Sequence, residues 1–167
     1  MADIELRLAG VQDIGLISSL AARIWPVCYS NIISAGQIDY MLGMMYSDVS
    51  LRRQMTEEGC RFTLAYSGDI PVGFSSTSEK EAGLFRLHKL YVDTSLHRKG
   101  VGSILLNDVL EYASEHGGDQ LELNVNKSNP AVRFYLARGF EVWREEVLDI
   151  GNGYVMDDFV MRRNIRA

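Results

Sequence analysis

The middle of the chain runs from a strand through a glycine turn and a helix into a second strand. Residues 84–92 are rich in Leu, Phe, Tyr and Val, which is typical of a strand, and residues 100–116 carry apolar side chains on one helical face. Gly117 and Gly118 then end the helix, and residues 121–125 alternate apolar and polar side chains. A strand-helix-strand crossover of this kind belongs to mixed α/β folds.

Further strands and helices are expected on both sides of this crossover. Ile4, Leu6 and Leu8 alternate with charged residues and predict a short strand. An apolar stripe over residues 14–24 predicts a helix, which we expect Pro26 to end. The other expected elements are one or two helices over 34–58, strands over 62–66 and 70–78, a short helix over 131–137, and strands over 140–150 and 154–163 joined by a glycine turn.

This order of elements predicts one domain over residues 1–167. The fold class is α/β, with a mixed central sheet of about seven strands, antiparallel hairpins at both ends and flanking helices. A length of 167 residues and a hydrophobic content of 47% are ordinary for a globular domain that buries its own core.

The charge balance argues against some classes of partner. The chain has 17 Lys and Arg against 22 Asp and Glu, whereas nucleic acids and anionic membranes attract a basic surface. A cationic substrate is compatible with this balance. Cys28 and Cys60 form no metal-binding spacing, and no apolar run approaches the ~18 residues of a membrane span. Because the N-terminus lacks a signal-peptide pattern, we expect a cytoplasmic protein with free thiols.

The turn before the central helix has the chemistry of a phosphate site. Gly100 and Gly102 allow a ligand to approach the backbone, and the first turn of a helix offers unpaired N–H donors. Arg98 and Lys99 add positive charge at the same place. The alternative is that both glycines only permit tight packing. The dinucleotide fingerprint does not fit, because Leu105 stands where its third glycine belongs, and the Walker phosphate loop does not fit either.

Two segments together resemble the GCN5-related N-acetyltransferase (GNAT) superfamily. His-Arg-Lys-Gly-Val-Gly at 97–102, after Leu-Tyr-Val, looks like the acetyl-CoA-binding motif of that family. The segment 126–140, with Asn-Pro-Ala and Phe-Tyr before Gly-Phe, is similar to a second motif of the family. The resemblance covers residues 61–163 well, and the closing segment 151–161 resembles bacterial small-molecule or polyamine acetyltransferases.

The resemblance implies a GNAT-like fold and acetyl-CoA as co-substrate. The pantetheine arm would lie beside Leu90, Tyr91 and Val92, at a place where the family has a splayed sheet. Either Ser128 or Asn129 would contact the arm. The pyrophosphate would sit on the backbone N–H groups of Lys99, Gly100, Val101, Gly102 and Ser103, with Arg98 beside it.

The resemblance also implies roles in catalysis. Tyr135 matches the family's general acid, which protonates the leaving thiolate; the alternative is an aromatic core residue beside Phe134. For the base, His88 stands where some relatives have a glutamate, and we expect it to share a strand face with Arg86 and Leu90. Glu122 is the second candidate base, and a water chain is the third possibility.

Substrate contacts are expected at two places. Trp25 and Tyr29 lie where the family forms one wall of the acceptor site, although core packing is the alternative. On the strands, Asn124 and Tyr154 are candidate substrate contacts. The carboxylates of Asp157 and Asp158 are placed to face a cationic amine, unless the last strand is simply solvated.

The predicted function is direct acetyl transfer from acetyl-CoA to a primary amine, such as a polyamine, without a metal or a covalent enzyme intermediate. A protein N-terminus or an amino sugar is an alternative acceptor. The rival function is a non-catalytic acyl-CoA-binding regulatory module. No nucleic-acid or membrane partner is expected, and a homodimer is left open.

Overall fold

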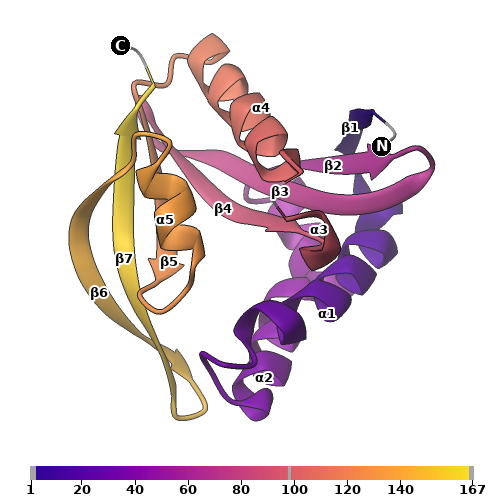
Figure 1. The fold of residues 1–167 in the computed structure, drawn as a ribbon, viewed down its shortest axis with the longest axis vertical. Coiled ribbons are helices and arrows are strands. Elements are labelled where there is room, and N and C mark those ends of the chain that lie inside the picture. Colours follow the sequence, from indigo (N-terminus) through magenta and orange to yellow (C-terminus); the bar gives the residue numbers. More distant parts are fainter. Residues whose placement is uncertain (1–2, 98, 166–167) are drawn as a thin grey trace.

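The computed structural model describes residues 3–97 and 99–165, and its elements follow the predicted order (Figure 1). The strands are β1 (Ile4–Ala9), β2 (Arg61–Ser67), β3 (Ile70–Glu81), β4 (Leu84–Val92), β5 (Gln120–Asn126), β6 (Glu141–Gly151) and β7 (Tyr154–Asn164). The helices are α1 (Ile14–Tyr29), α2 (Ala35–Tyr46), α3 (Asp48–Thr56), α4 (Val101–Glu115) and α5 (Ala131–Leu136), with short 3-10 turns at Val11–Asp13 and Thr94–Leu96. None of the helices in these ranges is long and apolar enough to cross a membrane.

All seven strands form one mixed sheet in the order β1-β2-β3-β4-β5-β7-β6, which confirms the predicted fold class. Only the β4–β5 pair is parallel, and α4 is the crossover that joins these two strands. Helices α1, α2 and α3 cover one face of the sheet, and α4 and α5 cover the other (Figure 1). The two apolar layers that result hold the sheet between them.

Strands β4 and β5 separate halfway along their length. Their parallel pairing runs from Leu84 opposite Gln120 to Leu87 opposite Leu123, and it ends there. Strand β4 nevertheless continues to Val92, and β5 continues to Asn126. The backbone of β4 beyond Leu87 therefore loses its β5 neighbour, and its N–H and C=O groups on that side need other partners.

A bulge in β4 corrects one prediction about its side chains. Ser76 of β3 lies opposite Lys89, but the next residue, Thr77, lies opposite Leu87, so His88 is an extra residue in β4. The extra residue resets the alternation of faces. Leu90 consequently packs with the α4 layer, whereas Lys89 turns toward α3 and donates to the Gln54 side chain at 2.7 Å. The prediction that Arg86, His88 and Leu90 share one face is therefore wrong.

Helix α1 also differs from the prediction at Pro26. The helix continues through Pro26 to Tyr29, and the amide of Ser30 still donates to the Pro26 carbonyl at 3.1 Å. A proline inside a helix removes one backbone hydrogen bond. Here Trp25 and Tyr29, both buried in the α1 layer, hold the last turn against the sheet. Tertiary packing therefore outweighs the local effect of the proline.

A charge cluster ties β4, β5 and β7 together around Glu122. The Glu122 side chain is fully buried, and three cations reach its carboxylate: Lys80 at 2.8 Å, Arg86 at 3.0 Å and Arg162 at 3.0 Å. Burial alone would raise the pKa of Glu122, but its bonds to Lys80 and Arg162 and the charge of Arg86 lower it below the usual value. The carboxylate is therefore ionised and fully engaged by the protein.

Replacing Glu122 tests this structural role. Glu122→Gln leaves three cations without their shared anion, so we expect a loss of about 3 kcal/mol in the free energy of unfolding by urea titration. Because the pKa of Glu122 is lowered in the fold, its contribution is present above the ordinary carboxyl pKa and is lost as the pH falls through the lowered pKa. The control is Glu145→Gln, a largely exposed partner of Lys127, for which we expect almost no loss. Equal losses in both variants would contradict the role.

Candidate active site

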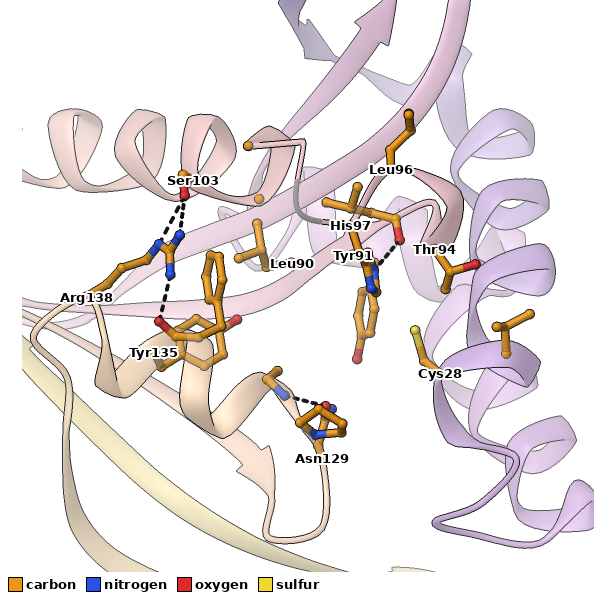
Figure 2. Close-up of a pocket in the computed structure, with 17 residues that line it drawn as sticks. Cys28, Leu90, Tyr91, Thr94, Leu96, His97, Ser103, Asn129, Tyr135 and Arg138 are labelled. Carbon is orange, nitrogen blue, oxygen red and sulfur yellow. Dashed lines mark hydrogen bonds between the residues drawn. The ribbon is translucent and has the colours of Figure 1, made fainter.

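A cavity of about 610 Å³ lies where β4 and β5 separate (Figure 2). Its walls come from the end of β4, the last turn of α1, the first turn of α4 and one side of α5. The lining residues are Val27, Cys28, Leu90, Tyr91, Val92, Thr94, Leu96, His97, Gly100, Gly102, Ser103, Asn129, Pro130, Ala131, Phe134, Tyr135 and Arg138. Three strand residues predicted for the cofactor, Leu90, Tyr91 and Val92, are among them.

The first turn of α4 presents to this cavity amides that have no partner among the described residues. Gly100 precedes the helix in the left-handed conformation, with φ 85°, and no side chain caps it. The Ile104 amide donates to the Gly100 carbonyl at 3.0 Å, which is the first hydrogen bond of the helix. The amides that precede Ile104 therefore have no acceptor within the helix. Gly102 and Ser103 line the cavity, whereas the Val101 side chain is buried in the core and leaves only its backbone for a ligand. This turn suits an anion.

The predicted phosphate site is one residue shorter than expected at its start. The amide of Lys99 donates to the carbonyl of Leu96 at 3.2 Å, so this N–H is already used by the protein. The Lys99 side chain is exposed and is not among the lining residues. Arg98, also predicted here, lies outside the described residues.

Arg138 is a cavity residue that the sequence analysis missed. Its guanidinium donates to Ser103 Oγ at 2.6 and 3.0 Å and to the Phe134 carbonyl at 3.1 Å, and it lies 3.7 Å from the centre of the Phe134 ring. Figure 2 shows this arginine reaching from the turn after α5 to the first turn of α4. It therefore adds a cation beside the free amides. Ser103 and Arg138 are 35 positions apart, and only the position of Arg138 just before Gly139 in the second motif could have suggested it.

Helix α5 and the loop before it place Tyr135 and Asn129 on the opposite wall. Tyr135 is buried between Phe134 and Phe140, and burial raises the pKa of its hydroxyl well above the usual value. Asn129 Oδ1 accepts from the Ala131 amide at 2.9 Å and so fixes the start of α5. Of the two residues left open for the pantetheine contact, Asn129 lines the cavity, and Ser128 does not.

An aromatic layer stands behind the cavity wall formed by Tyr91. The hydroxyls of Tyr29 and Tyr91 lie 2.9 Å apart, and the Trp25 ring centre lies 4.6 Å from that of Tyr29 and 5.5 Å from that of Tyr91. Burial raises the pKa of Tyr29 to about 12, so its hydroxyl stays protonated at neutral pH. Trp25 and Tyr29 do not line the cavity. Their packing agrees with the alternative stated above, that Trp25 and Tyr29 are core residues.

Neither candidate base reaches the cavity. His88 Nε2 lies 2.7 Å from Ser78 Oγ, and burial, together with the charges of Lys89 and Arg86, lowers the pKa of His88 to about 4. The imidazole is therefore neutral at pH 7 but a weak base. Glu122 is held by its three cations. Both side chains lie outside the cavity lining, which separates them from the predicted catalytic position.

The predicted substrate residues on the strands hold elements together. Asn124 accepts from Arg86 at 2.8 Å and donates to Glu146 at 2.8 Å, so its amide links β5 to β4 on one side and, across β7, to β6 on the other. The Tyr154 ring centre lies 5.4 Å from that of Tyr40 in α2. Neither residue lines the cavity. Their positions lie on the sheet face that carries α1, α2 and α3, opposite α5.

Helix α2 is bridged to the hairpin of β6 and β7. Tyr40 donates to the carbonyl of Ile150 at 2.6 Å, and Gln37 donates to the carbonyl of Val155 at 2.8 Å. Figure 1 shows the tip of this hairpin beside α2, and the bridging residues lie in the first half of that helix. Among the residues that the structure describes, no group of three or more His, Cys, Asp or Glu side chains gathers as a metal site would need.

Solved structures with the same fold include several acetyltransferases. The PaiA N-acetyltransferase of Thermoplasma acidophilum, solved with coenzyme A, has a TM-score of 0.83 at 23% identity, over 97% of this chain and 99% of that one. A GCN5-related N-acetyltransferase from Rhodopseudomonas palustris has a TM-score of 0.83 at 19% identity, over 98% and 97%. The Escherichia coli ribosomal-protein-S18-alanine N-acetyltransferase has a TM-score of 0.74 at 16% identity, over 99% and 96%. At sequence identities this low, the structural similarity establishes the fold alone.

Sequence comparison identifies the family. An uncharacterized N-acetyltransferase of Methanocaldococcus jannaschii is 34% identical over 80 residues, which are 42% of this chain and 34% of that protein. The match thus spans about a third of that curated relative. The family model described as an acetyltransferase (GNAT) domain matches residues 33–156, which is most of the chain. The glycine turn, the second motif and the separated strands all lie within this match, and the chain belongs to the GNAT acetyltransferase family.

Proposed function

We propose that this protein transfers an acetyl group from acetyl-CoA to the primary amine of a small molecule. One observation carries the proposal: a single cavity joins the free amides at the start of α4 to the hydroxyl-bearing side chain of Tyr135, along the unpaired edge of β4. The PaiA structure with coenzyme A and the family match support the choice of co-substrate.

The cavity residues divide the binding of acetyl-CoA among them. The amides from Gly100 to Ser103, with Arg138 beside them, receive the pyrophosphate. The exposed backbone edge of Leu90 to Val92 pairs with the amide groups of the pantetheine arm, as an additional strand would. When bound, acetyl-CoA supplies the activated acetyl group as a thioester.

Tyr135 is the proposed general acid. Burial raises the pKa of its hydroxyl, so the group holds its proton at neutral pH and has it available for the departing thiolate. A backbone N–H near Tyr91 or Val92 stabilises the thioester oxygen as negative charge develops on it. The pKa of about 4 at His88 and the saturated carboxylate of Glu122 leave water as the proposed carrier of the amine proton.

The contacts between α2 and the β6–β7 hairpin support a small acceptor. The two side-chain bridges, from Tyr40 and Gln37, join the elements on the sheet face opposite α5. An extended peptide bound across this face would keep both bridges broken, whereas a compact amine needs them open only while it enters. The rival function, a regulatory acyl-CoA-binding module, leaves the buried Tyr135 hydroxyl at the cavity without a purpose.

An acceptor panel tests the function itself. Polyamines, amino acids, aminoglycosides and N-terminal peptides are offered with acetyl-CoA, and free thiol release is measured against a reaction without acceptor. We expect the fastest release with small primary amines and little with peptides. Acetyl-CoA binding without release on any acceptor would favour the regulatory module, and release on peptides alone would move the acceptor class to protein N-termini.

Removing the Tyr135 hydroxyl separates binding from catalysis. Tyr135→Phe keeps the ring between Phe134 and Phe140, so we expect acetyl-CoA binding by calorimetry to stay unchanged. Turnover should fall at least about tenfold, because the thiolate loses its proton donor. The control is Tyr112→Phe, which alters a ring packed against Phe85 in the other half of the α4 layer. Unchanged turnover in Tyr135→Phe would remove this residue as the acid.

Two glycines at the ends of α4 provide a matched pair for the phosphate site. Gly100 and Gly117 have φ 85° and 83°, and a Cβ on either would meet no atom of the described residues within 4 Å. Alanine in this conformation costs about 1–2 kcal/mol, so both substitutions should lower stability by similar amounts. Only Gly100→Ala places a methyl group beside the anion site, and we expect its CoA Kd to rise about tenfold, or about 1.4 kcal/mol. Equal Kd values for both variants would place the phosphates elsewhere.

A further inference from the structure

One carboxylate on the sheet face opposite α5 has an incomplete set of partners. Asp158 of β7 is buried, with 3% of its surface exposed. Its Oδ2 accepts from Asn124 Nδ2 at 3.3 Å, whereas its Oδ1 has no hydrogen-bond partner in the described part of the chain. A buried charged oxygen without a partner is costly in free energy, and such groups are rare in folded proteins.

The neighbouring carboxylates are neutralised, which sets Asp158 apart. Glu122 has three cations around it. Glu146 of β6 pairs with Arg144 at 3.2 Å and accepts from Asn124. Within the described ranges, no Lys, Arg or His nitrogen lies within the 4.0 Å of an ion pair with Asp158. This carboxylate is therefore one that the fold leaves without a counter-ion.

Electrostatics agree with this geometry. Burial raises the pKa of Asp158, and the charges of Glu146 and Asp157 raise it further. The Asn124 hydrogen bond and the charge of Arg86 act in the opposite direction without outweighing burial. A cation placed at Oδ1 would relieve the penalty, because it would supply the missing opposite charge.

Asp158 lies next to the place where the strands separate. It stands opposite Asn126, the last residue of β5, and Asn126 directly precedes the loop that carries Asn129 into the cavity. It is also close enough to Tyr29 for its charge to contribute to the raised pKa of that hydroxyl, which is bonded to Tyr91 at the cavity wall. The tyrosine pair thus connects the surroundings of the carboxylate with the cavity wall.

We propose that Asp158 is the acceptor site of this enzyme and that its Oδ1 binds the ammonium group of a primary aliphatic amine. The inference rests on the proposed function, because it says how the acceptor amine of that reaction binds, namely in its charged ammonium form. Asn124 holds the other carboxylate oxygen, so Oδ1 keeps a fixed direction. The ligand that completes the site carries one ammonium at this point, since a single oxygen is unpaired.

The acceptor enters from the side closed by the two bridges between α2 and the hairpin. Both are single hydrogen bonds, from Tyr40 to Ile150 and from Gln37 to Val155, next to the turn that joins β6 and β7. A single hydrogen bond of this kind adds little net stability, so thermal motion opens the pair often enough for a small cation to enter.

The test is calorimetry on the CoA-saturated protein at neutral pH, a measurement that needs no turnover. Methylamine, butylamine and putrescine are the probes, and methanol and butanol are their neutral counterparts. We expect the amines to bind and the alcohols not to bind. In Asp158→Asn we expect the amine Kd to rise at least tenfold, while the Kd for CoA stays within twofold.

The matched control is Asp157→Asn, which removes the adjacent carboxylate. Asp157 points to the other face, is about half exposed and pairs with Lys127 at 2.9 Å, so we expect amine binding as in the unaltered protein. Thermal melting without amine adds a second readout. Asp158→Asn should keep or raise Tm, because it removes a charge that burial disfavours, whereas a carboxylate with a purely structural role would lower it.

Three results overturn the inference: amines and alcohols that bind alike, no amine that binds the unaltered protein, or amine binding that survives Asp158→Asn. If Asp158→Asn fails to fold, the comparison of amines with alcohols still decides. Failure of the proposed function is distinct. Amines that bind through Asp158 without any acetyl transfer would leave the cation site in place and reject only the transferase.

Discussion

The architecture depends on the point at which the backbone pairing between β4 and β5 ends. Beyond Leu87 and Leu123, β4 and β5 no longer share hydrogen bonds, although both strands continue. Polar backbone on an open edge requires a partner, and the fold surrounds this one with the start of α4, the side of α5 and the end of α1. The cavity is therefore a consequence of how the sheet separates, and the helices that line it are also the two layers that hold the sheet together.

The element order, the strand-helix-strand crossover and the glycine turn were predictable because each leaves a local mark in the sequence. Side-chain contacts across the sheet could not be predicted in this way. The bulge at His88 changes the face on which Leu90 lies, and no glycine or other turn residue in the sequence indicates it. Pro26 stays inside a helix because aromatic side chains distant in the sequence pack against its last turn. Arg138 reaches Ser103 through tertiary contact alone. Predicted catalytic roles for His88 and Glu122 rested on strand position, and position does not reveal which partners a side chain meets.

The polar interior separates into two kinds of site. Around Glu122 the protein supplies every countercharge itself, which makes the carboxylate part of the scaffold. At Asp158 it supplies an amide on one oxygen and leaves the other open. Asn124 contacts Arg86 of the first site and Asp158 of the second, so the rigid cluster also orients the incomplete one. The stabilising cluster and the proposed amine site thus share the same short stretch of β5.

The extra residue in β4 divides that strand into two segments of opposite phase. Before it, Leu87 packs with the α4 layer, and after it Leu90 does the same, three positions later instead of two or four. If the same residues ran in regular alternation without the bulge, Tyr91 would point away from Trp25 and Tyr29, and every later side chain of the strand would change face. The three-position spacing between Leu87 and Leu90 therefore requires one bulged residue, and a strand shortened by the loss of His88 would keep Leu90 and Tyr91 on their present faces.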